Sequence, residues 1–82
     1  MQDDFAKRGQ QFYDENLREK LEPEQTGRYV AIEPDSGRYF LDDTGTGALV
    51  RGREEMPDGL FYLMRVGYQT ADTIGGYASR IR

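Results

Sequence analysis

The stretch that most constrains the fold is GRYVAIEPDSGRYFLDD, residues 27–43, in which two alternating segments flank a cluster of turn-forming residues. Proline presets its own φ angle, Asp and Ser bond to nearby backbone, and Gly adopts positive φ, so residues 34–37 are typical of a tight turn. Val30 and Ile32 point to the opposite face from their neighbours, with the period of two that is typical of a strand. This stretch therefore predicts a β-hairpin whose second strand covers residues 38–41.

A helix is predicted on each side of the hairpin. Between residues 3 and 22, large apolar residues recur at spacings of three, four and seven, which indicates an amphipathic helix; they are Phe5, Phe12, Tyr13, Leu17 and Leu21. Pro23 ends this helix because it disfavours helical geometry in the residue before it. Residues 43–56 predict a second helix, and because each of its three glycines costs about 1 kcal/mol relative to alanine, we expect it to form only when packed.

The most apolar run of the chain, LFYLMRV at residues 60–66, predicts a third strand that is screened on both faces. The resulting order α-β-β-α-β predicts an α+β domain, with a three-stranded sheet and both helices covering one face. We expect the hairpin strand at residues 29–32 to be central. The strand at residues 60–66 then lies on an edge that a second copy of the chain covers, unless it is itself the central strand.

The length of the chain, 82 residues, indicates a single domain, which we expect to span residues 1–76 and to include a last helical turn ended by Gly75 and Gly76. Residues 77–82 are expected to form a frayed tail. A chain of this size buries about 60–65% of the surface that it exposes when unfolded, so its core is thin. A homodimer would add the contact area that the small core lacks.

The chain contains no cysteine and no histidine. These absences exclude disulfides, the usual zinc sites, a Ser-His-Asp triad and a histidine general base. No apolar run approaches the roughly 20 residues that a membrane span needs, and the polar start MQDDFAKRGQ is unlike a signal peptide. We therefore expect a cytoplasmic protein with no cofactor, no metal and no membrane contact.

The formal net charge of −4 is unevenly distributed. Acids outnumber bases over residues 1–58, whereas bases outnumber acids over residues 59–82, which contain Arg65, Arg80 and Arg82. Nucleic-acid binding needs a concentrated basic face, so weak binding through these three arginines is kept only as an alternative. The acidic part of the chain favours a basic protein partner.

The tripeptide Asp43-Thr44-Gly45 has the sequence of an aspartic-protease motif, in which two carboxylates share a proton and activate water. Ile74 and the glycine after it echo the hydrophobic-Gly element that flanks such a site. Only 28 residues lie between Gly45 and Ile74, too few for the flap and the several strands of a protease. A carboxylate-dependent hydrolase with Asp43 as its active acid is therefore an alternative and not the main interpretation.

The same segment has two further interpretations. Gly45-x-Gly47 between a strand and a helix suggests a phosphate cradle, but Val50 stands where the third glycine is needed. Asp42 and Asp43 are adjacent carboxylates, and whether this acidic turn binds a cation is left open. The simplest interpretation is that Asp43 or Thr44 caps the second helix, because a helix start needs a short side-chain acceptor.

Five short motifs punctuate the chain: Glu-Pro-Glu at 22–24, Gly-Arg-Tyr-Val-Ala-Ile at 27–32, Ser-Gly-Arg-Tyr-Phe at 36–40, Pro-Asp at 57–58 and Phe-Tyr-x-x-Arg-Val-Gly at 61–67. Together they resemble the pattern of a family of small uncharacterised bacterial proteins, a domain of unknown function, over residues from about 12 to 76. No activity is established for that family, and the resemblance implies an antitoxin-like or accessory role beside a neighbouring gene product. The glycines of residues 45–47 depart from the family's Glu- and Ala-rich helix, which further weakens a catalytic role for Asp43.

These observations predict a non-enzymatic protein-binding module that forms a homodimer. Its contact surfaces are expected on the first helix and on the third strand, at Phe12, Tyr13, Leu17, Leu60, Tyr62, Met64 and Arg65. Arg65 lies inside the most apolar strand, so we expect it to be paired structurally, with Glu33 or Asp35, and not to bind a ligand.

Overall fold

The computed structural model describes residues 2–68, and the α-β-β-α-β order predicted from the sequence is confirmed. The elements are α1 (Gln2–Phe12), the π-helical segment η1 (Tyr13–Leu17), α2 (Arg18–Leu21), β1 (Tyr29–Glu33), β2 (Arg38–Asp42), α3 (Gly45–Glu55) and β3 (Tyr62–Arg65). The last helical turn expected near Gly75 and Gly76, the domain boundary at residue 76 and the tail at 77–82 lie outside the described residues. Over residues 2–68, no helix has the length and apolar character to cross a membrane.

The three strands form one antiparallel sheet in the order β2-β1-β3, so the class is α+β, and the hairpin strand is central, as predicted. The turn between β1 and β2 has the predicted chemistry: Gly37 adopts a φ of 81°, and the Glu33 carboxylate accepts a hydrogen bond of 2.7 Å from the Ser36 N–H. The third strand begins at Tyr62 and not at Leu60, and it lies at an edge. Among the described residues, β2 and β3 are therefore the edge strands of the sheet.

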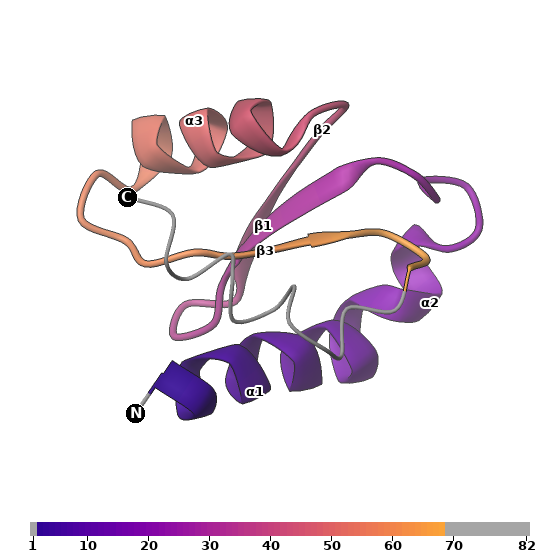
Figure 1. The fold of residues 1–82 in the computed structure, drawn as a ribbon, viewed down its shortest axis with the longest axis horizontal. Coiled ribbons are helices and arrows are strands. Elements are labelled where there is room, and N and C mark those ends of the chain that lie inside the picture. The colour runs from indigo at the N-terminus through magenta and orange to yellow at the C-terminus, as the bar shows by residue number, and fades with distance from the viewer. Residues whose placement is uncertain (1, 69–82) are drawn as a thin grey trace.

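The prediction that both helices cover one face of the sheet is wrong. Val30 and Ile32 of β1 pack against α1, η1 and α2, whereas Ala31 of the same strand packs against Ala48 of α3 on the other face. Figure 1 shows the sheet between α1 below and α3 above. The physical reason is that successive strand residues point to opposite faces and β1 is apolar on both, so each face needs its own cover.

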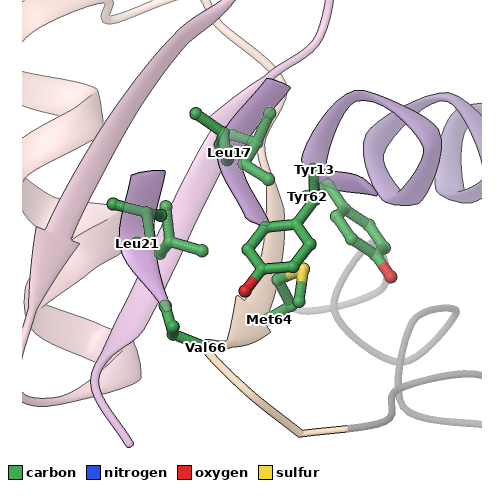
Figure 2. Close-up of a cluster of buried hydrophobic side chains, with 8 residues drawn as sticks. Tyr13, Leu17, Leu21, Tyr62, Met64 and Val66 are labelled. Carbon is green, nitrogen blue, oxygen red and sulfur yellow. The ribbon is translucent and has the colours of Figure 1, made fainter. Parts of the chain in front are cut away.

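The first helical region buries one residue in every four, and the π-helical segment explains how it does so. Residues 9, 13, 17 and 21 are all buried. An α-helix has 3.6 residues per turn, so a strict spacing of four overshoots by about 40° at each step. A π-helical turn is wider and reverses this drift. Tyr13, Leu17 and Leu21 therefore stay on the sheet side, where they meet Tyr62 and Met64 (Figure 2).

The close packing of α1 and α3 depends on glycine at two positions. A Cβ on residue 9 would lie 2.6 Å from Cβ and Cδ2 of Tyr62, so Gly9 lets α1 lie directly on β3. On the other face, a Cβ on residue 52 would come within 2.8 Å of the Phe61 ring. The glycines that weaken helix propensity in isolation are thus the residues that allow these helices to pack.

Candidate functional site

The acidic turn before α3 is built around the start of that helix. Thr44 has extended φ and ψ angles of −124° and 156°, and its Oγ1 accepts a hydrogen bond of 2.9 Å from the Gly47 N–H. This geometry makes Thr44 the N-cap residue. Of the two caps that the sequence left open, Thr44 and not Asp43 is therefore the one that the fold uses.

Asp42 supports the cap from the end of β2. One of its carboxylate oxygens accepts hydrogen bonds from the Thr44 N–H at 3.2 Å and from the Thr44 hydroxyl at 3.4 Å. The other accepts from Nε of Arg51, about two helical turns into α3, at 3.3 Å. The Thr44 N–H is the main cause that lowers the pKa of Asp42 below its ordinary value, and the bond with Arg51 acts in the same direction.

Asp43, the residue that a protease would use, points away from this cap. Its side chain is 86% exposed, and its Oδ1 lies 3.0 Å from Nε of Arg28. The hydrolase alternative needs Asp43 to meet a second carboxylate, but across residues 2–68 its partner is a cation. The part of the chain that the structure describes also contains no group of three or more acidic, histidine or cysteine side chains that could hold a metal ion. Ile74, the other element of the protease interpretation, lies outside that part.

The contact residues predicted from the sequence divide into two groups. Four of them are core residues, so the prediction that they form an exposed contact surface is wrong: Tyr13 and Leu17 are each 1% exposed, and Tyr62 and Met64 are each 2% exposed. The reason is that the same apolar periodicity that suggested a binding face is needed to cover this domain's own sheet. Phe12 is half-buried against that core, whereas Leu60 and Arg65 are exposed.

Arg65 has partners other than the predicted ones. Its Nε donates a hydrogen bond of 3.0 Å to the Gly27 carbonyl, and its guanidinium carbon lies 5.4 Å from the Tyr29 ring centroid and 4.4 Å from that of Tyr68. Glu33 is out of reach because the β1–β3 register places Arg65 opposite Tyr29, at the other end of β1. Pairing with Glu33 or Asp35 is therefore not what the structure shows, although Arg65 is bound structurally, by a carbonyl and two rings.

Most arginines of the described chain are neutralised by acids. Five form ion pairs: Arg8 with Asp35, Arg18 with Asp14 and Glu22, Arg28 with Asp43, Arg38 with Glu55, and Arg51 with Asp42. Contact with phosphates would have to replace these acids, which disfavours a nucleic-acid interface on this part of the molecule. Arg80 and Arg82 lie outside the described residues.

A feature that the sequence analysis missed is the edge at β2. Within residues 2–68, β2 pairs with β1 alone, so its outer side has no strand partner there. Tyr39 and Leu41 of this strand are half-buried on the α1 face, and Phe12, also half-buried, packs against the same core cluster. An edge strand with apolar residues on its surface is a ready template for another strand. The sequence of β2, Arg-Tyr-Phe-Leu-Asp, is apolar between two opposite charges, but this pattern alone does not tell an edge strand from a central one.

The comparisons with known proteins add no relative. No family model matches the chain, and neither a curated protein nor a solved structure matches it. The resemblance to small bacterial proteins therefore stays a prediction, and the site has to be interpreted from its own geometry.

Proposed function

We propose that this chain is a non-enzymatic protein-binding module whose contact element is the edge strand β2, assisted by Phe12. The observation that supports the proposal is the outer side of β2, which has no strand partner within residues 2–68, together with the half-buried side chains of Tyr39 and Leu41. Strand addition is a general mode of peptide recognition, in which main-chain hydrogen bonds provide affinity and alternate side chains provide specificity.

The polar residues of the domain support a binding role over a catalytic one. Thr44 and Asp42 are engaged in capping α3, and Asp43 is paired with Arg28. A general acid or base needs a group that is free to reach a substrate proton. Side chains that already hold a helix start or an ion pair are poorly suited to that task.

The sequence suggests what kind of partner this module would bind and where. The acidic net charge favours a partner with a basic surface. The resemblance to small bacterial proteins adds an accessory or antitoxin-like role in the cytoplasm, with binding to a neighbouring gene product. This role requires no enzyme activity.

The test is to capture the partner from native cells with the tagged wild-type chain and with two tagged variants that each carry one new lysine. Lysine on an edge strand blocks strand addition, so Tyr39→Lys is expected to abolish capture. Leu60→Lys is the matched control because Leu60 is 69% exposed and lies in the loop between α3 and β3. Circular dichroism establishes that both variants are folded. Capture that survives Tyr39→Lys but is lost with Leu60→Lys would contradict the assignment to β2.

A further inference from the structure

We infer that the occupant of the β2 edge is the same strand of a second copy of this chain, paired antiparallel about a two-fold axis at Phe40. The inference rests on the proposed function, because it takes β2 to be the contact element. It names a second copy of the chain as the protein that β2 binds, and binding of a different protein at this edge is the competing outcome of the test. The product joins the three strands described for each copy into one continuous sheet, in which β2 of each copy covers β2 of the other.

The sequence of β2 is complementary to itself in this register. In an antiparallel pair, residues on the same face lie opposite one another, so a two-fold axis at Phe40 sets Arg38 against Asp42 of the second copy. It also sets Tyr39 against Leu41 on the α1 face, and Phe40 against its own equivalent on the α3 face. Every position of the strand therefore meets a side chain of matching chemistry.

The ion pairs already present on the α3 face support the same register. Arg38 is paired with Glu55 at 3.4 Å, and Asp42 with Arg51 at 3.3 Å, so α3 lies along β2 with an ion pair at each end of the strand. The side chains of Arg38 and Asp42 are 49% and 29% exposed, which leaves both accessible to a further partner. When the copies pair, Asp42 of one copy lies between its own Arg51 and Arg38 of the second copy. Arg38 of the second copy also keeps its own Glu55, so a row of alternating charges crosses the contact.

The other edge strand lacks this property. Strand β3 is Tyr-Leu-Met-Arg, with one base and no acid, so no register of β3 with itself sets opposite charges against each other. Its single charged residue, Arg65, is held by the Gly27 carbonyl and by two tyrosine rings. The contact between copies is therefore assigned to β2 and not to the strand at residues 60–66 that the sequence favoured.

The test exploits the two-fold symmetry through charge-reversal variants studied by sedimentation equilibrium. The Arg38→Glu chain alone sets acid against acid twice, and the Asp42→Arg chain alone sets base against base twice. Each is expected to dimerise about tenfold or more weakly than the wild type. An equimolar mixture of the two variants restores both attractive pairs, so it is expected to form mixed dimers. Arg65→Glu, a charge reversal on the other edge strand, is the control and is expected to leave the dissociation constant unchanged.

A second measurement leaves Asp42 and its capping bonds intact. The chain has no cysteine, so the variants Tyr39→Cys and Leu41→Cys each introduce a single thiol. Directly opposed residues of an antiparallel pair have the Cα separation that a disulfide needs. Oxidation of the mixture is therefore expected to yield a covalent dimer, whereas each variant alone yields little, because its thiol faces an unmodified side chain.

Three results would overturn the inference: a wild-type monomer up to millimolar concentration, a dimer that both charge reversals leave unchanged, or cross-linking that is no greater in the mixture than in either variant alone. Different results would overturn the proposed function. A monomer that captures another protein through Tyr39 retains the binding role and rejects self-pairing, whereas a captured protein that is indifferent to Tyr39→Lys rejects β2 as the contact element.

Discussion

Asp42 and Gly47 lie in direct contact across the start of α3. A Cβ on residue 47 would overlap the Asp42 carboxylate and come within 2.9 Å of Thr44 Oγ1. The Gly-Thr-Gly segment that suggests a phosphate cradle thus leaves room for a side chain of the protein itself. This contact explains why α3 tolerates a glycine in its first turn.

Gly47→Ala is expected to destabilise the fold, although alanine is the better helix former by about 1 kcal/mol. The added methyl group displaces the Asp42 carboxylate from the Thr44 N–H and hydroxyl, and we expect a net loss of about 1–2 kcal/mol. Urea unfolding measures the change. In an Asp42→Ala background, where the displaced carboxylate is absent, the same substitution is expected to cost much less. Equal costs in the two backgrounds would contradict the contact.

Thr44→Ala is expected to lower the free energy of unfolding by about 1 kcal/mol, because the Gly47 N–H loses its acceptor. Thr44→Ser is the matched control, since serine keeps the oxygen that accepts this bond. The helical signal of both variants and their urea midpoints are the measurements. A loss of similar size in the serine variant would argue that the threonine methyl group, and not the cap, is responsible.

Gly9→Ala tests the close approach of α1 to β3. The new methyl group would overlap the base of the Tyr62 ring, so the helix has to move away from the strand, at a cost of about 1–3 kcal/mol. The measurement is again the urea midpoint. Gln11→Ala, at an exposed position of the same helix, is expected to change stability by no more than about 0.5 kcal/mol. Comparable effects of the two substitutions would reject the close approach.

Titration of the buried Tyr13 hydroxyl is expected to lower the stability of the fold at alkaline pH. Burial, together with the 2.6 Å hydrogen bond from its hydroxyl to the Glu22 carboxylate, raises the pKa of Tyr13 from 10.0 to about 12. A folded-state pKa above the unfolded value means that the contribution to stability is complete below pH 10 and is lost as the pH rises through about 12. The difference in unfolding free energy between the wild type and Tyr13→Phe is therefore expected to shrink over that range.

The control for this pH dependence is Tyr68→Phe. Tyr68 is 51% exposed, so its replacement removes no buried hydroxyl and is expected to change stability by no more than about 0.5 kcal/mol. A Tyr13→Phe profile parallel to that of the wild type over the same range would show that the phenol titrates alike in the folded and unfolded chains.

The elements of this fold could be predicted because their signals are local. The turn at residues 34–37 follows from its own chemistry, and the end of the first helical region follows from Pro23. The cap at Thr44 depends on a residue only three positions away. The π-helical segment could not be predicted in this way, because its cause is the need to hold Tyr13, Leu17 and Leu21 against the sheet.

The prediction of an exposed contact surface was wrong because it depended on contacts between residues that are distant in sequence. The sequence marks Tyr13, Leu17, Tyr62 and Met64 as apolar but does not tell which of them meet one another. In the folded chain they pack together across 45 residues or more of sequence and become the core. The candidate edge at β2 emerges only once the strand order is known, since the same five residues would be covered in a central strand.

By itself the sequence determined that the chain is an α+β domain, where its hairpin turns, and that histidine and cysteine chemistry is absent. The tertiary structure decided that the helices cover opposite faces, which aromatic side chains are buried, and that β2 lies at an edge. Turn chemistry and periodicity act between neighbours along the chain. Which side chains are buried, which face of the sheet a helix covers and which strand lies at an edge all depend on contacts between residues that are distant in sequence.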